Sequence, residues 1–266
     1  MIIYKTDDEI RAMKRSNRIV ARVLAGLVPL VKPGVTTKDL DEYAEKRTRE
    51  MGAAPAFKGY RGFPASLCAS VNEEIVHGIP SSRKLKDGDI LSLDCGVIFE
   101  GYFGDSSVTV PVGEISPEAA RLIAAARESF DAGISRMKEG NRVSDISAAI
   151  QERVEADGFS VIRAFVGHGI GRSLHEEPQV PNFGLPGHGP KIRRGLVLAI
   201  EPMIAMGDWE IEILANGWTA VTKDRSLAAH YEHTVACTGN GVEILSAWEG
   251  LGDSTGNVMD KESLNA

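Results

Sequence analysis

Two β-forming runs share the stretch Leu91-Ser-Leu-Asp-Cys-Gly-Val-Ile-Phe-Glu-Gly-Tyr-Phe-Gly-Asp105-Ser-Ser-Val-Thr-Val110. Glycines at positions 101 and 104 separate the runs, so the pattern predicts a hairpin or two adjacent strands. Asp94 and Asp105 each lie inside or against an apolar run, where an unpaired carboxylate would be strongly destabilising. A single aspartate at such a place is usually a turn or strand-end residue. Two that lie so close in sequence most readily share a cation, and the rest of the chain decides between these interpretations.

The composition is that of an ordinary soluble globular protein. The 266 residues are 43% hydrophobic and 25% charged, with a formal net charge of −7. This length allows one sizeable core, in one large domain or two closely packed ones. The modest acidity argues against a nucleic-acid-binding surface, which clustered Lys and Arg would indicate. No charge-free apolar run approaches the roughly 20 residues of a membrane span, so no membrane association is expected.

Cysteine usage and the start of the sequence both favour a cytoplasmic location. Cys68, Cys95 and Cys237 are few, odd in number and far apart, which fits neither a disulfide framework nor a Cys-rich zinc site. Residues 1–9 lack the basic and apolar segments of a secretory signal. A monomer is expected, because no heptad pattern or obvious apolar surface stretch argues for assembly.

Capping patterns and apolar runs predict a chain that mixes helices and strands. Residues 6–9 form a capping-box pattern, and Ser116 precedes a proline at the first helical position. The expected helices span 6–31, 36–50, 116–139 and 144–158, with Thr36 or Thr37 capping the second and Ser144 the fourth. Further β-like runs are expected at 67–72, 162–166, 196–200, 211–215 and 234–237, and residues 251–266 are expected to form a polar, frayed tail.

The second half of the chain repeats the first. Residues 32–52 match residues 138–158, and residues 85–94 match residues 192–201, at nearly the same offset and in the same order. This period is far too long for a solenoid. It predicts two similar halves, at about 6–110 and 116–238, that face each other across a pseudo-twofold axis. Asp94 and Glu201 occupy matching positions, so both are expected to point into one shared cleft.

Two more residues extend this group of candidate ligands. His168 stands between glycines at the end of an apolar run, and Glu232 lies just before the run at 234–237, which is expected to be the final strand. A lone histidine there would more often be structural. One histidine and four carboxylates form an oxygen-dominated set, which suits Mn, Fe(II), Co or Zn better than a structural zinc site. Four negative charges in a small site require at least two divalent cations, unless some of them stay protonated.

This ordered set resembles the five metal ligands of the methionine aminopeptidases. Strings similar to the signatures of that family surround it: Asn72-Glu-Glu-Ile-Val-His77-Gly-Ile-Pro80, Gly167-His-Gly-Ile-Gly-Arg172, His175-Glu-Glu-Pro178, Ile200-Glu-Pro-Met203 and Tyr231-Glu-His-Thr234. The match covers roughly residues 4–248. It is to the short bacterial type I form, since the chain shows neither an N-terminal extension nor a long insertion between His175 and Glu201. The resemblance implies an α/β (α+β) pita-bread fold, with two pseudo-symmetric βααβ-like halves around a curved antiparallel sheet in one catalytic domain, residues 1–250.

The resemblance also implies a metal centre with two divalent ions. Asp94 chelates one ion, Asp105 and Glu232 bridge both, and His168 and Glu201 complete the other. Two such ions lower the pKa of a shared water and polarise the scissile carbonyl.

Three residues carry the implied catalytic roles. Glu201 is the expected proton shuttle, and His175 is expected to hydrogen-bond the carbonyl oxygen as charge develops on it. His77 is expected to contact the scissile nitrogen or the substrate main chain. For His77 and His175 the alternative is a purely structural histidine.

The implied pocket for the methionine side chain has aromatic and sulfur-containing walls, which suit a flexible thioether. Its residues are Tyr60, Phe63, Cys68, Leu174 and Trp218. Phe63 and Leu174 depart from the commonest bacterial pattern, where a tyrosine and an aromatic residue are usual. The volume of the pocket and its inhibitor preference are therefore open.

The implied activity is removal of the initiator methionine from nascent polypeptides, at the ribosome, when the second residue is small. An X-Pro aminopeptidase or prolidase would share the fold and the ligand types, but normally carries an extra N-terminal domain. A non-catalytic relative acting as a ribosome-associated binding module would typically have lost ligands. A purely structural domain would leave five buried acids and histidines without a purpose.

Overall fold

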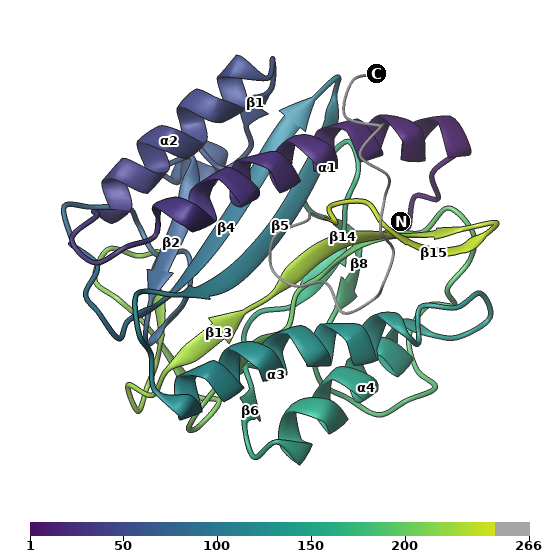
Figure 1. Cartoon of the computed structure of the whole chain (residues 1–266). Coiled ribbons are helices and arrows are strands. Elements are labelled where there is room, and N and C mark those ends of the chain that lie inside the picture. The colour runs from purple at the N-terminus through teal and green to yellow at the C-terminus, as the bar shows by residue number, and fades with distance from the viewer. Residues whose placement is uncertain (248–266) are drawn as a thin grey trace.

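The computed structural model describes residues 1–247. Its helices are α1 (Asp7–Leu27), α2 (Thr37–Glu50), α3 (Pro117–Ile134) and α4 (Val143–Ala156), with short 3₁₀ segments η1 (Val28–Leu30) and η2 (Tyr60–Gly62) (Figure 1). The capping box predicted for α1 is confirmed, because the Thr6 hydroxyl accepts from the Glu9 amide while the Glu9 carboxylate accepts from the Thr6 amide. Thr36 and Asp39 make the same pair of hydrogen bonds for α2. The predicted tail at 251–266 lies outside the described residues.

Several helix boundaries differ from the prediction. α1 ends at Leu27 and continues as η1 rather than as a helix to 31, and α4 ends at Ala156 rather than at 158. α3 ends at Ile134 rather than at 139. α4 begins one residue before Ser144, because the Asp145 carboxylate accepts from the Arg142 amide at 2.7 Å and closes the first turn there. Ser144 therefore lies inside the first turn, and its hydroxyl donates to the carbonyl oxygen of His188 instead of capping the helix.

The predicted hairpin is confirmed as β4 (Ile90–Phe99) and β5 (Tyr102–Pro111), which pair along their whole length. Glu100 and Gly101 make a two-residue connection with φ of 50° and 77°, the left-handed values that a tight hairpin turn requires. The hairpin belongs to a nine-stranded sheet whose central order is β1-β4-β5-β14-β9-β7-β8, with β2 on β4 and β15 on β14. The remaining strands of this sheet are β1 (Ala54–Pro55), β2 (Leu67–Val71), β7 (Gly167–Gly169), β8 (Glu176–Val180), β9 (Val197–Ile200), β14 (Glu232–Thr238) and β15 (Gly241–Ile244).

The strands of this sheet have a similar arrangement on both sides of its centre. β5 meets β14 at the centre, β4 and β9 flank them, and β2 and β7 come next on either side. Two small sheets complete the structure, one with the order β13-β10-β6 and one with the order β11-β12-β3. Their strands are β3 (Glu74–Val76), β6 (Ser160–Val161), β10 (Met203–Ala205), β11 (Ile211–Ile213), β12 (Ala220–Thr222) and β13 (Ala228–His230).

Two strand predictions were wrong. Residues 162–166 are not a strand, because the chain leaves β6 there and Phe165 and Val166 turn to line a cavity. The run at 234–237 is not the final strand either. It belongs to β14, whose first residue is Glu232, and β15 follows it.

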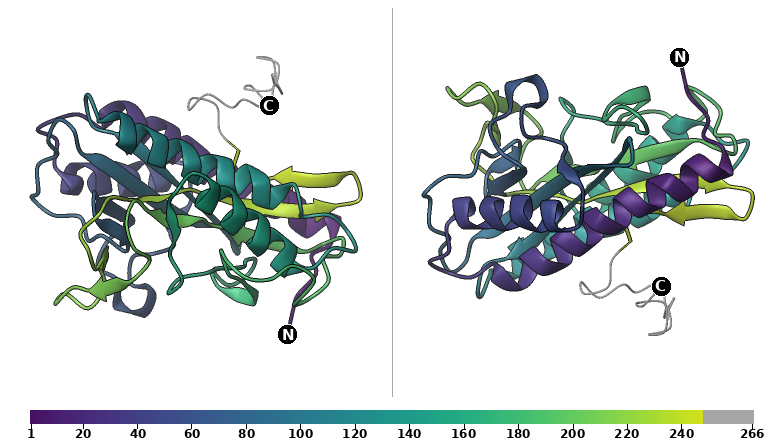
Figure 2. Two further views of the ribbon diagram at one scale, coloured as in Figure 1. Left: turned by 90° about the horizontal axis from the view of Figure 1, so that it is seen from below. Right: turned by 90° about the horizontal axis from the view of Figure 1, so that it is seen from above.

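Side-chain alternation along the hairpin separates the core from the polar face. Leu91, Leu93 and Val97 point toward α1 and α2 and join their core, so Asp94 projects to the opposite face. α3 and α4 cover the second half of the sheet with a core of their own. α1 and α3 lie along the same side of the sheet in both views of Figure 2. The other face is thereby left for a site.

Candidate metal centre

A cavity of about 200 Å³ lies on the face of the sheet away from α1 and α2. Each side chain that the sequence assigned to the metal, to catalysis or to the methionine pocket lines it. These residues are Tyr60, Phe63, Cys68, His77, Asp94, Asp105, His168, Leu174, His175, Glu201, Trp218 and Glu232. The fold therefore brings together segments that are up to 172 residues apart in sequence.

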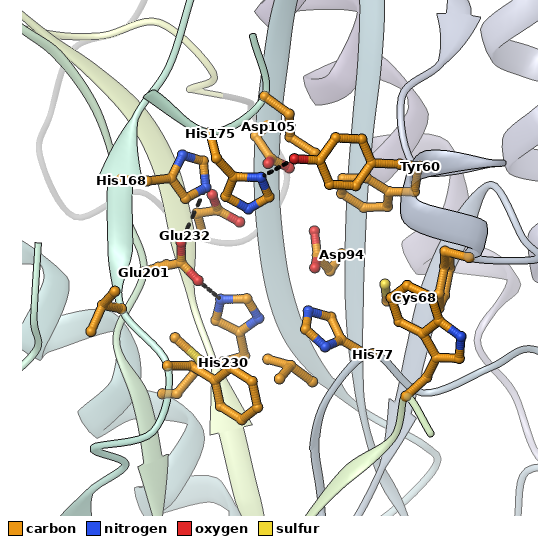
Figure 3. A pocket seen from close by; sticks show the side chains of 18 of the residues that line it. Tyr60, Cys68, His77, Asp94, Asp105, His168, His175, Glu201, His230 and Glu232 are labelled. Carbon is orange, nitrogen blue, oxygen red and sulfur yellow. Dashed lines mark hydrogen bonds and ion pairs between the residues drawn. The ribbon is translucent and has the colours of Figure 1, made fainter. Parts of the chain in front are cut away.

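Three of the predicted ligands form a tight group. Asp105, His168 and Glu232 each offer a ligand atom, and these atoms all lie within 4.8 Å of one another. They come from β5, β7 and β14 of the same sheet. Asp94 on β4 and Glu201 directly after β9 complete the lining on either side (Figure 3).

Hydrogen bonds from hydroxyl groups connect β5 and β14, the strands that carry Asp105 and Glu232. The two strands pair through only two residue pairs before they diverge. Two hydroxyl groups add hydrogen bonds between these strands: Thr234 donates to the Asp105 carbonyl at 2.9 Å, and Ser106 donates to the Glu232 carbonyl at 2.7 Å. Side-chain hydrogen bonds thus supplement a short ladder and hold the backbone of two predicted ligands.

His168 and Glu201 lie side by side on the other edge of the group. The two side chains approach to 3.4 Å between Nε2 and Oε1. His168 Nδ1 is 3.0 Å from the Gly169 carbonyl, so Nδ1 carries the hydrogen and Nε2 keeps a lone pair for a cation. Burial lowers the pKa of His168 to about 3, which keeps the ring neutral. The Glu201 backbone is fixed by Asn182, whose side-chain amide donates to the Glu201 carbonyl at 2.9 Å.

The four carboxyl groups cannot all be ionised without a cation. Burial raises the pKa of Asp94 to about 7. Burial, together with the charge of the neighbouring carboxylates, raises the pKa values of Asp105, Glu201 and Glu232 well above their usual range. Buried oxygen atoms Oδ1 of Asp94, Oδ1 of Asp105 and Oε1 of Glu232 have no hydrogen-bond partner among residues 1–247. Clustered, unpartnered oxygen atoms beside one imidazole nitrogen fit divalent metal ions.

The two outer histidines lie at different sides of the cavity. His175 stacks at a tilt on His168, with 4.3 Å between ring centroids, and its Nδ1 is 2.8 Å from the Tyr60 hydroxyl. When Tyr60 donates to Nδ1, the Nε2–H of a neutral His175 is free to donate to a substrate. Burial lowers the pKa values of both His175 and His77 and so favours the neutral rings. His77 contacts Phe165 edge to face at 5.5 Å.

The predicted methionine pocket is apolar. Phe63 and Trp218 pack edge to face at 5.2 Å between ring centroids, and Leu174 is buried. Cys68 lies opposite Asp94 in the β2–β4 pair. Burial raises the pKa of its thiol well above the usual value, so Cys68 is a neutral wall rather than a nucleophile.

Sequence reasoning missed seven residues of the lining, and His230 is the one histidine among them. The seven are Phe57, Arg61, Val76, Phe165, Val166, Met203 and His230. His230 Nε2 lies 3.8 Å from Oε2 of Glu201. The available signal was its place two residues before Glu232, since side chains two apart in extended chain share a face.

Comparisons with known proteins agree with this geometry. Residues 11–239 match metallopeptidase family M24. The methionine aminopeptidase of Clostridium acetobutylicum is 54% identical over 250 residues, which cover 94% of this chain and 100% of that protein. Methionine aminopeptidase 1 of Bacillus subtilis is 50% identical over 246 residues, covering 92% of this chain and 99% of that protein. The chain belongs to the methionine aminopeptidases of family M24.

Solved structures confirm the pita-bread fold that the sequence predicts. The methionine aminopeptidase of Thermotoga maritima superposes with a TM-score of 0.91 at 46% identity, covering 92% of this chain and 99% of that one. The prolidase of Pyrococcus horikoshii has a TM-score of 0.77 at 20% identity, covering 94% of this chain and 65% of that one. The second likeness concerns the fold alone.

The family also confirms the predicted class of activity. Methionine aminopeptidases of family M24 are metal-dependent hydrolases, and the buried Asp105, His168 and Glu232 fit metal binding. Among the described residues, no helix combines the length and apolar character that crossing a membrane requires. The one-domain division at residue 250 and the individual roles of the site residues stay predictions.

Proposed function

We propose that the protein removes the initiator methionine from nascent proteins and peptides whose second residue is small, with two divalent ions held by Asp94, Asp105, His168, Glu201 and Glu232. The observation that carries this proposal is a group of buried, unpartnered carboxylate oxygens directly beside an apolar pocket. The ions are drawn from Co, Mn, Fe and Zn. Four carboxyl groups that repel one another support two ions rather than one.

The pocket supports methionine as the side chain removed. Phe63, Trp218 and Leu174 present apolar surface, and Cys68 adds sulfur. Such walls suit an unbranched, polarisable thioether, while a charged side chain would lose its hydration there without a partner. We propose that the part of the cleft beyond the carboxylates limits the second residue to a small one.

The chain supplies three groups for the reaction. When bound, the ions acidify a water molecule and polarise the scissile carbonyl. Glu201 takes the proton from the water oxygen and passes it to the leaving nitrogen. His175 donates from Nε2 to the carbonyl oxygen as negative charge builds on it. His77 contacts the scissile nitrogen or the substrate main chain from the opposite side.

The proposed substrate suggests where in the cell the enzyme acts. Initiator methionines occur on nascent polypeptides, so we propose action in the cytoplasm on N-termini at the ribosome. The formal net charge of −7 supports contact with the polypeptide rather than with nucleic acid. The enzyme is proposed to act as a monomer.

Release of methionine from Met-Ala-Ser tests this function. Chelator-stripped protein is titrated with Mn(II), Co(II), Fe(II) or Zn(II), and activity is expected to return as two equivalents bind. Met-Gly and Met-Ala peptides should be cleaved well and Met-Lys poorly. Folded protein that stays inactive with every ion would contradict the aminopeptidase mechanism. Equal cleavage of the three peptides would contradict only the limit on the second residue.

A further inference from the structure

His230 is a buried residue of the cavity for which the mechanism above has no use. It ends β13, and only 2% of it is exposed. The hydroxyl of Thr109 on β5 clamps its backbone from both sides, accepting from the His230 amide at 2.8 Å and donating to the His230 carbonyl at 2.9 Å. The backbone is therefore fixed, and the ring is held in the cavity.

Neither ring nitrogen of His230 has a hydrogen-bond partner among the described residues. An imidazole always carries at least one N–H, and a buried donor left unpaired costs about 1–3 kcal/mol. Such a group in a folded protein calls for an explanation. The Glu201 carboxylate is an acceptor that lies close to this ring across the cavity.

The two oxygens of Glu201 face two different imidazoles. Oε1 lies 3.4 Å from Nε2 of His168, and Oε2 lies 3.8 Å from Nε2 of His230 (Figure 3). A shift of about 1 Å would bring the second contact to hydrogen-bond length. His230 is thus the side chain placed to set the rotation of the Glu201 carboxylate.

We propose that His230 is a positioning residue for Glu201, donating its Nε2–H to Oε2 so that Oε1 stays on the side of His168. This inference rests on the function proposed above for Glu201. The hydrogen bond occupies one lone pair of Oε2 and leaves the other for a proton. It also reduces the freedom of the carboxylate before a metal ion or a substrate arrives.

The geometry favours positioning over direct metal binding. The ligand atoms that gather within 4.8 Å of one another belong to Asp105, His168 and Glu232, and His230 is not among them. Its second ring nitrogen lies toward the side of His77 in Figure 3. A role in substrate binding is therefore the alternative that the experiment has to separate.

The test compares His230→Leu with His230→Gln. Leucine removes the donor, and glutamine restores an N–H at similar reach. Metal affinity is measured by calorimetry with Mn(II) on stripped protein, and kcat and KM on Met-Ala-Ser at saturating Mn(II). Losing the partner of a ligand costs about 10–100-fold in metal affinity or activity. We expect losses of that size in affinity and kcat for His230→Leu, with KM within about twofold, and recovery of both in His230→Gln.

His233→Gln is the matched control. His233 is a second buried histidine outside the cavity lining, and its ring contacts Ser246 at 2.8 Å, Tyr231 at 3.1 Å and the Ser106 hydroxyl at 3.2 Å. Glutamine at this position can still accept from Ser106. This substitution is expected to lower the melting temperature and leave metal affinity within about twofold. A general loss of stability could therefore be told apart from the specific loss of metal affinity and kcat expected for His230→Leu.

Three outcomes would overturn the inference. His230→Leu could bind Mn(II) and turn over like the wild type, or His230→Gln could be as impaired as His230→Leu. A rise in KM with unchanged kcat would make His230 a substrate-binding residue instead. Failure of the proposed function is distinguishable, because the wild type would then release no methionine, while the calorimetry would still report on His230.

Discussion

At the scale of single residues, Glu201 is the side chain on which the proposed chemistry depends most. Glu201→Gln keeps the shape of the side chain, but it replaces one acceptor oxygen with an NH2 donor and cannot take up a proton. We expect a loss of about 10²–10⁴-fold in kcat, the usual contribution of a general acid–base group. Measuring methionine release at saturating Mn(II) checks this.

Stability gives the control for that substitution. Burial already opposes the charge of Glu201, so the metal-free Glu201→Gln protein should melt no lower than the metal-free wild type. Glu210→Gln, at an exposed carboxylate paired with Lys223 at 2.8 Å, should leave both turnover and stability nearly unchanged. Wild-type turnover in Glu201→Gln would remove this residue from the mechanism.

At the scale of elements, a buried ion pair fastens the start of β8 to the N-terminal segment. Lys5 Nζ lies 2.5 Å from the Glu176 carboxylate, with side-chain exposures of 3% and 7%. The same carboxylate accepts from the backbone amides of Arg172 and Ser173 and so shapes the turn before His175. Lys5→Met leaves Glu176 buried without its cation, and we expect a loss of about 3–5 kcal/mol in the free energy of unfolding. Urea denaturation measures it.

An exposed pair on the next element is the comparison for Lys5. Arg11 and Asp8 also form an ion pair, but their side chains are 66% and 84% exposed. Arg11→Met should therefore cost no more than about 1 kcal/mol. Equal effects of Lys5→Met and Arg11→Met would show that burial of the Lys5–Glu176 pair contributes nothing.

At the scale of the whole molecule, the carboxylate cluster links stability to pH and to metal. In metal-free protein, burial raises the pKa of Asp94 to about 7 and those of Asp105 and Glu232 well above their usual range. Each of these carboxyl groups keeps its proton in the folded state at a pH where it has lost it in the unfolded state, so the contribution of the cluster to stability falls as pH rises from about 4 through 7. Bound metal holds the carboxylates ionised without that penalty. The melting-temperature difference between Mn(II)-loaded and stripped protein should therefore widen from about pH 5.5 to pH 8.

The carboxylates that cap helices change stability with pH in the opposite direction to the cluster, and they do so at lower pH. Hydrogen bonds from the backbone lower the pKa values of Glu9 and Asp145, so the stability they contribute is lost only below about pH 4. Their titration therefore lies below the window from pH 5.5 to 8. Stripped Asp94→Asn protein should lose part of the pH dependence there. A melting-temperature difference that is constant across the window would contradict the linkage.

Local chemistry made much of this protein predictable from its sequence. Thr6 and Thr36 cap their helices through groups only three residues away, and a two-residue turn at Glu100 and Gly101 closes the hairpin. Alternation along β4 and β5 then puts Asp94 and Asp105 on the face that the helices leave uncovered. Carboxylates inside apolar runs indicate a bound cation if the fold brings them close together. These features follow from neighbours in the chain, which the sequence by itself specifies.

Tertiary contacts decided the remaining features. The short strands β3, β10, β12 and β13 are too brief to show a period of two, and exist because a partner strand lies beside each. Ser144 does not cap its helix, because the fold brings the His188 carbonyl within reach of the Ser144 hydroxyl. The place of His230 against Glu201 depends on a Thr109 hydroxyl 121 residues away. Which group satisfies a buried polar atom is set by what the fold brings near it, and no local pattern of residues encodes that distance.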